Sequence, residues 1–168
     1  MPQPQLPDAE ALCAELAEAM RPHVDPAATA LVGIHTGGVW IAERLQQLLG
    51  LKVTPGAIDV SFYRDDFSQR GLHANAKRSQ IPFDVDGAHI VIVDDVLYTG
   101  RTIRAAMNEL FDYGRPAKVE LAVLADRGGR ELPISASYCP HSLSLPATQM
   151  LALERADDGR LSFRLIDK

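Results

Sequence analysis

A short apolar run, residues 90–93, limits the possible folds more than any other segment of the chain. Consecutive aliphatic residues without polar alternation are typical of a central parallel strand, which is buried on both faces. Asp94 and Asp95 follow directly, and residues 99–102 then open a segment with helical spacing of apolar residues. Strand, turn and helix in this order predict one repeating unit of an α/β fold.

The other segments alternate in the same way. Apolar spacing predicts a helix over about 8–20, with Asp8 as its N-cap, and a second helix that follows residues 36–38 and ends at Gly50, with Leu48 in its buried stripe. A third helix is expected over 102–113, strands over 30–34, 57–63, 90–93 and 119–125, and a C-terminal hairpin of 149–154 with 161–166. This order predicts a mostly parallel sheet with helices on both faces.

Composition narrows the class of protein. A length of 168 residues fits one domain, and 46% apolar residues argue against general disorder. A net charge of −5 excludes a strongly basic nucleic-acid binder, although a local patch remains compatible with it. Cys13 and Cys139 form neither a disulfide framework nor a zinc motif. With no targeting segment and no apolar run of membrane-spanning length, we expect a soluble cytoplasmic protein with a disordered end over 1–7.

The most specific chemical signal is the stretch 91–102, VIVDDVLYTGRT. Its turn presents backbone N–H groups and the positive end of a helix dipole, which together make an anion site. Two carboxylates beside such a site repel the same anion unless the ligand also offers hydroxyl groups or a divalent cation. A sugar phosphate offers both. A capped helix with an incidental acidic pair is the alternative, and it fits the pair alone better than the whole pattern.

This stretch resembles the phosphoribosyl pyrophosphate (PRPP) motif of type I phosphoribosyltransferases. Together with YRDD at 63–66 and DRGGRELPI at 126–134, it is similar to the PyrR family of pyrimidine-operon regulators with uracil phosphoribosyltransferase activity. The resemblance covers roughly residues 30–135. It implies a single phosphoribosyltransferase domain over 1–168, a flexible lid loop over 64–80, and a hood with C-terminal strands over 126–168.

The resemblance also implies roles for individual residues. Asp94 and Asp95 would hold the ribose hydroxyls and lie near a Mg²⁺ ion that is bound mainly through the substrate, and Arg64 would belong to the lid and to the catalytic set. PRPP-binding residues would be Thr36, Gly37, Gly38, Tyr98, Thr99, Gly100, Arg101, Thr102, Lys77 and Arg78, and base-binding residues Asp126, Arg127 and Gly128. Each motif has a plainer interpretation: a tight turn at 37–38, a solvated linker at 64–80, and a surface ion pair at 126–127.

Two positions depart from the family pattern. Gly37 replaces the usual arginine of the pyrophosphate loop, and Gly129 replaces a frequent histidine. The function implied is uracil transfer from PRPP to give UMP and diphosphate, together with UMP-dependent binding of pyr messenger RNA by a dimer or tetramer. The candidates for RNA contact are Arg21, Arg127 and Arg130. Alternatives are a phosphoribosyltransferase without RNA binding, or one that acts on another base.

Overall fold

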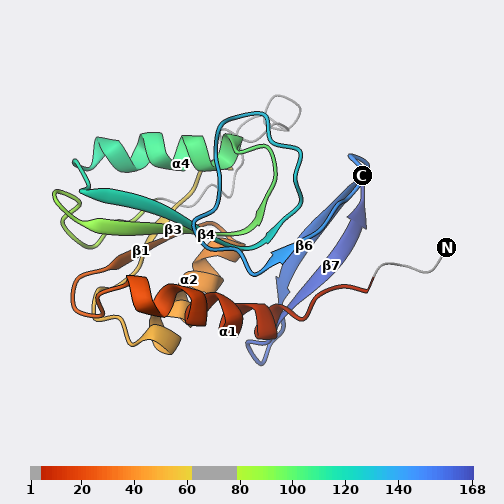
Figure 1. Ribbon diagram of the computed structural model, residues 1–168, viewed down its shortest axis with the longest axis horizontal. Helices are drawn as coiled ribbons and strands as arrows, with labels where there is room; N and C mark the ends of the chain where they lie inside the picture. The colour runs from red at the N-terminus through yellow and green to blue at the C-terminus, as the bar shows by residue number, and fades with distance from the viewer. Residues whose placement is uncertain (1–4, 62–78) are drawn as a thin grey trace.

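The computed structural model describes residues 5–61 and 79–168. Within them a five-stranded sheet has the order β2-β1-β3-β4-β5, and every neighbouring pair is parallel (Figure 1). The strands are β1 (Ala30–Ile34), β2 (Gly56–Ile58), β3 (His89–Leu97), β4 (Lys118–Asp126) and β5 (His141–Ser142). The predicted parallel α/β sheet is confirmed.

Helices cover both faces of the sheet (Figure 1). On one face lie α1 (Ala9–Met20), which continues into the short helix η1 (Arg21–His23), and α2 (Gly37–Leu49); α4 (Arg101–Asp112) lies on the other. Alternate residues of β3 divide between the two cores. Val91 and Val93 pack with α1 and α2, whereas Ile90 and Ile92 pack with α4. The central strand is therefore buried on both sides, as its continuous apolar run predicts.

The predicted helix boundaries hold where capping chemistry defines them. Asp8 accepts hydrogen bonds from the first-turn N–H groups of α1, and Gly50 ends α2 with a φ of 65°, a conformation that favours glycine. Leu48, predicted in the buried stripe of α2, is 40% exposed. That prediction is wrong because Ile41, Leu45 and Leu49, spaced by four residues, already define the face that packs on the sheet.

A separate antiparallel hairpin, β6 (Gln149–Arg155) with β7 (Leu161–Asp167), stands beyond the carboxyl ends of β3 and β4 (Figure 1). Four of its side chains, Leu151, Leu153, Leu161 and Phe163, are buried in the core that contains α1 and α2. Glu10 of α1 adds a polar contact, because its Oε1 accepts a hydrogen bond of 2.8 Å from the Leu161 backbone N–H. The other oxygen of Glu10 pairs with Arg44 of α2. One carboxylate thus joins the first helix, the second helix and the hairpin.

Two strand predictions need correction. β2 ends at Ile58 rather than at residue 63, since the chain turns there and the Ser61 N–H donates to the Asp59 side chain. β3 does not stop before Asp94 but continues to Leu97, because β4 offers it pairing partners along this whole stretch.

Parts of two other predictions lie outside the described residues. The proposed lid over 64–80 falls there except for its last two residues, and Gln80 exchanges two backbone hydrogen bonds of 2.8 Å with Ala57. The first four residues of the predicted disordered end also lie outside, whereas Leu6 packs against the core around α1. None of the helices within 5–61 and 79–168 combines the length and apolar character needed to cross a membrane.

Candidate active site

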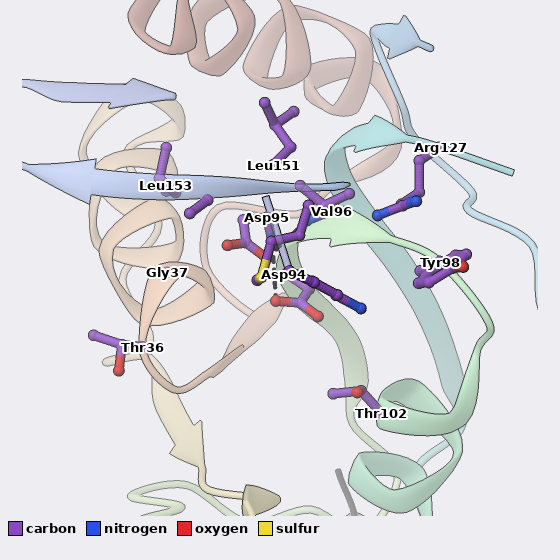
Figure 2. A pocket seen from close by; sticks show the side chains of 13 residues that line it. Thr36, Gly37, Asp94, Asp95, Val96, Tyr98, Thr102, Arg127, Leu151 and Leu153 are labelled. Carbon is purple, nitrogen blue, oxygen red and sulfur yellow. Dashed lines mark hydrogen bonds between the residues drawn. The ribbon is translucent and has the colours of Figure 1, made fainter. Parts of the chain in front are cut away.

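A pocket of about 350 Å³ opens at the carboxyl ends of the central strands, beneath the hairpin (Figure 2). Ligands of open parallel sheets bind at this edge. The predicted site residues that the structure brings together here are Thr36, Gly37, Asp94, Asp95, Tyr98, Thr102 and Arg127. The rest of the lining comes from Val96, Lys168 and the β6 residues Met150, Leu151, Ala152 and Leu153.

The acidic pair lies at the centre of the pocket (Figure 2). The backbone N–H of Asp95 donates to Asp94 Oδ1 at 2.9 Å, and that of Val96 donates to Asp95 Oδ1 at 2.7 Å. These bonds fix the orientation of both carboxylates. Their negative charge suits a ligand that offers hydroxyl donors, a bound cation, or positive charge that develops during a reaction.

Two adjacent glycines bring the start of α2 against this pair. A Cβ atom on Gly37 would lie 2.7 Å from Asp95 Oδ2, and one on Gly38 would lie 2.3 Å from a backbone oxygen of β3. At position 38 only glycine permits this approach, whereas at position 37 a larger residue would displace the Asp95 carboxylate. Thr36, the N-cap residue, makes no side-chain capping bond, and the peptide between His35 and Thr36 is cis. The close approach of Gly37 and Gly38 places the first N–H groups of α2 beside the carboxylates, where a helix N-terminus favours an anion.

A second helix N-terminus faces the pocket from the opposite side. Gly100, with a φ of 94°, is the N-cap of α4, and the Arg101 N–H donates to Thr99 Oγ1 at 3.2 Å. Tyr98 and Thr102 line the pocket, whereas the Arg101 side chain pairs with Glu131 at 3.0 Å and is half exposed. The pocket thus lies between two helix N-termini, the end of a helix that favours an anion, with two carboxylates between them.

The segment after β4 contributes one predicted residue to the pocket. Arg127 is buried and lines it, while Gly128 is exposed. Asp126 lies beside the site rather than in its lining, and its carboxylate pairs with Arg130 at 2.6 Å. The hydrogen bond from Arg130 holds the pKa of Asp126 below its usual value, against the opposing effect of partial burial.

The three arginines expected to contact RNA bind acceptors of the protein itself. Arg21 pairs with Glu18 at 2.9 Å and remains exposed. Arg127 donates to three backbone carbonyls, and Arg130 donates to Tyr98 O, Ile134 O and the Asp126 carboxylate. Contact of these residues with RNA stays a prediction, and the contacts made by Arg127 and Arg130 lend it no support.

Sequence reasoning missed the wall formed by Met150–Leu153 and by Lys168. The alternation in 149–155 indicates a strand, but it carries no signal for where that strand packs. Arg64, Lys77 and Arg78, predicted to serve the site, lie outside the described residues.

The acidic pair also fits a magnesium ion of the kind that binds together with a phosphorylated substrate. Mg²⁺ prefers oxygen ligands and commonly takes one or two carboxylates together with substrate phosphates and water. Asp94 and Asp95 provide such carboxylates between the two helix N-termini.

Comparison with known proteins agrees with this geometry. The family model described as a phosphoribosyl transferase domain matches residues 4–141. Among solved structures, a hypoxanthine-guanine phosphoribosyltransferase from Bacillus anthracis superposes with a TM-score of 0.67 at 17% identity, covering 85% of this chain and 86% of that one. The hypoxanthine phosphoribosyltransferase of Trypanosoma cruzi gives 0.61 at 22% identity, covering 81% and 77%. The fold and the domain match define a phosphoribosyltransferase.

Curated relatives are closer in sequence. The bifunctional protein PyrR of Nitrosococcus oceani is 53% identical over 82% of this chain and 79% of its own length. The bifunctional protein PyrR of Pseudomonas putida is 49% identical over 90% of this chain and 95% of its own length. The chain therefore belongs to the PyrR family.

Proposed function

We propose that this protein is a uracil phosphoribosyltransferase, which converts uracil and PRPP into UMP and diphosphate. The observation that carries the proposal is the placement of Asp94 and Asp95 between the N-termini of α2 and α4 in one pocket. PRPP has the matching order of groups: a phosphate at one end, a ribose with two hydroxyls, and a pyrophosphate on the anomeric carbon.

Each part of the pocket receives one part of PRPP. The turn of residues 98–102 binds the 5′-phosphate through its N–H groups and hydroxyls, and Thr36 with Gly37 and Gly38 binds the pyrophosphate. Asp94 and Asp95 accept hydrogen bonds from the ribose hydroxyls. The two anionic groups are thus held apart, which exposes the anomeric carbon to the acceptor base.

The reaction breaks the bond between the anomeric carbon and a pyrophosphate oxygen and forms a bond from that carbon to N1 of uracil, which loses its proton. Positive charge develops on the ribose in the transition state, and the Asp94–Asp95 pair stabilises it electrostatically. No covalent nucleophile is needed. A Mg²⁺ ion held by substrate oxygens, with Asp94 or Asp95 nearby, would neutralise charge on the departing diphosphate.

The acceptor base lies on the side of the pocket that is not assigned to the phosphate, the pyrophosphate or the ribose. That wall is largely apolar, with Val96, Leu151 and Leu153, and Arg127 borders it. A flat base fits such a wall through its ring faces. Among the hood residues proposed for base recognition, Arg127 has the most direct support because it lines the pocket, whereas Asp126 and Gly128 act from its edge.

A substrate comparison tests the enzymatic proposal. Purified protein with PRPP and Mg²⁺ is given uracil, hypoxanthine, guanine or orotate in parallel, and diphosphate release is measured. Turnover with uracil well above the others is expected. Preference for a purine or for orotate would refute uracil as the acceptor and would mean that the protein is a phosphoribosyltransferase for another base.

We also propose that the protein regulates pyrimidine genes by binding the leader of pyr messenger RNA in a UMP-dependent manner, as a cytoplasmic homo-oligomer. Support for this half comes from relatives that are named bifunctional. An electrophoretic shift of the organism's own pyr leader, with and without UMP, is the test. If no shift occurs at low salt while uracil transfer is intact, the protein is an enzyme that does not bind this RNA, and the regulatory proposal fails.

A further inference from the structure

Arg127 is the only charged side chain that is buried among residues 5–61 and 79–168, with 6% of its surface exposed. Its Nη1 donates to Gln149 O at 2.8 Å, and its Nη2 donates to Leu145 O at 3.3 Å and Pro146 O at 3.1 Å. These carbonyls belong to the segment that leads into β6 and to its first residue. Arg127 therefore holds the start of the strand whose next residues form the apolar wall of the pocket.

The same guanidinium lies on the ring of Tyr98, with its central carbon 3.9 Å from the ring centroid (Figure 2). Gly129 makes this stack possible. It has a φ of 77°, and a Cβ atom there would lie 2.5 Å from Tyr98 Cε1, so a larger residue would displace the ring. Arg127 thus contacts both the turn assigned to the 5′-phosphate and the start of β6, the strand that forms the wall assigned to the base.

One donor of Arg127 has no partner. Its Nε–H is buried and makes no hydrogen bond. An unsatisfied buried donor destabilises the folded state, so an arginine at this position carries a cost that a purely stabilising residue would avoid. The placement of the guanidinium between the two walls offers a reason for that cost.

We propose that Arg127 is a positioning residue that sets the separation between the β6 wall and the Tyr98 turn, and thereby allows a base and a ribose 5-phosphate to be bound at the same time. It acts on the base through β6, and it acts on the phosphate turn through the stack on Tyr98. A lysine cannot replace it, because an ammonium group neither stacks as a plane nor spans three carbonyls. The proposal rests on the proposed function for the assignment of the two walls.

Calorimetric titration with UMP and with ribose 5-phosphate tests the proposal, because the two ligands differ only at the anomeric carbon, which carries uracil in one and a hydroxyl in the other. In the wild type, the ratio of the two dissociation constants measures how much the base adds to the binding affinity. Arg127→Gln and Arg127→Lys are expected to weaken UMP about 10-fold or more, a change of about 1.4 kcal/mol, with ribose 5-phosphate affinity changed by less than about 2-fold.

Arg155→Gln is the matched control. Arg155 lies on the same hairpin and also stacks on an aromatic ring, with its guanidinium carbon 4.8 Å from the ring centroid of Trp40, but it does not line the pocket. The control is expected to leave both dissociation constants unchanged. A lower melting temperature in the Arg127 variants with an unchanged ratio of constants would mean a structural role only, and would overturn the proposal.

Two further arms keep the test decisive. If both Arg127 variants fail to fold, Tyr98→Leu removes the stack while it leaves the carbonyl bonds. Any direct loss of phosphate binding affects both ligands equally, so UMP affinity is expected to fall more than ribose 5-phosphate affinity; an unchanged ratio of the two dissociation constants would overturn the proposal. GMP and AMP are titrated alongside. If the wild type binds GMP or AMP more tightly than ribose 5-phosphate but does not bind UMP more tightly, the assignment of uracil as the base is refuted. The Arg127 variants are then compared with the wild type using the nucleotide that binds. If no base adds affinity in the wild type, the proposal fails.

Discussion

Gly38→Ala should separate α2 from the central strand. The added Cβ would lie 2.3 Å from Val93 O and 3.1 Å from Val93 C, whereas real Cβ atoms essentially never approach a heavy atom within 3.0 Å. Both partners belong to backbone, so the helix start and the strand must move apart by about 0.7 Å or more. Overpacking of this kind costs about 1–3 kcal/mol. At about 2–4 °C per kcal/mol for a chain of this size, the melting temperature should fall by roughly 2–12 °C.

Gly37→Ala makes the same chemical change one residue earlier and meets a different obstacle. Its Cβ would lie 2.7 Å from Asp95 Oδ2, the end of a side chain that can rotate. The fold should therefore tolerate this variant, with a melting temperature close to that of the wild type. Its cost should appear in turnover instead, because the carboxylate beneath the ribose is displaced. Misplacement approaching 1 Å costs up to about 100-fold in rate.

Differential scanning calorimetry and the diphosphate-release assay are run on both variants and the wild type. Gly38→Ala should lose stability together with activity, and Gly37→Ala should lose activity alone. Equal melting temperatures for the two variants would refute the reasoning from backbone contact. Full turnover by Gly37→Ala would show that the orientation of Asp95 seen here is not required.

Other predictions follow from the same geometry. Asp94→Asn and Asp95→Asn, made separately, should keep the fold by circular dichroism and reduce turnover by about 100-fold or more with saturating PRPP, since charge is lost but shape is kept. Burial, together with a hydrogen bond to Glu120, raises the pKa of Tyr138 to about 12. The contribution of Tyr138 to the free energy of unfolding should therefore be lost as pH rises from the unfolded pKa of the tyrosine through its folded pKa. Alkaline unfolding of Tyr138→Phe should lack that loss. The pKa of Asp126 is lowered in the folded protein, so its contribution to the free energy of unfolding is present above its unfolded pKa and is lost as pH falls through its folded pKa. In Asp126→Asn, the free energy of unfolding should therefore fall less steeply with decreasing pH in a series of acid denaturation measurements.

The sheet and its helices could be predicted from the sequence because local signals were strong. The uninterrupted run at 90–93 indicates a central strand, and Asp8 and Gly50 have the capping chemistry of helix ends. The end of β3 could not be predicted in the same way. Asp94 and Asp95 look like residues that follow a strand, and only pairing with β4 keeps them in one. The acidic pair and both helix starts nevertheless meet in one pocket, as the spacing along the chain indicates.

The base side of the pocket could not be predicted because it depends on tertiary packing. Nothing in the sequence of 149–155 tells that its side chains meet residues more than fifty positions earlier. The sequence places Arg127 in the base-binding set by resemblance and leaves a surface ion pair as the alternative, because a single sequence reports charge and not burial. The burial of Arg127 depends on the carbonyls of residues 145, 146 and 149 and on the Tyr98 ring, which the chain brings to it only in the folded state.

The hydrogen bond from Leu161 to Glu10 spans 151 positions of the chain. A contact of such long range repays its loop-closure entropy only after most of the sheet has formed, which places docking of the hairpin late in folding. Regions that dock last, through long-range contacts with the rest of the fold, are also those that open first under native conditions. Amide hydrogens of β6 and β7 should therefore exchange as one unit at a lower opening free energy than those of β3. A nascent chain would acquire its phosphate sites before it acquires the wall that completes the pocket.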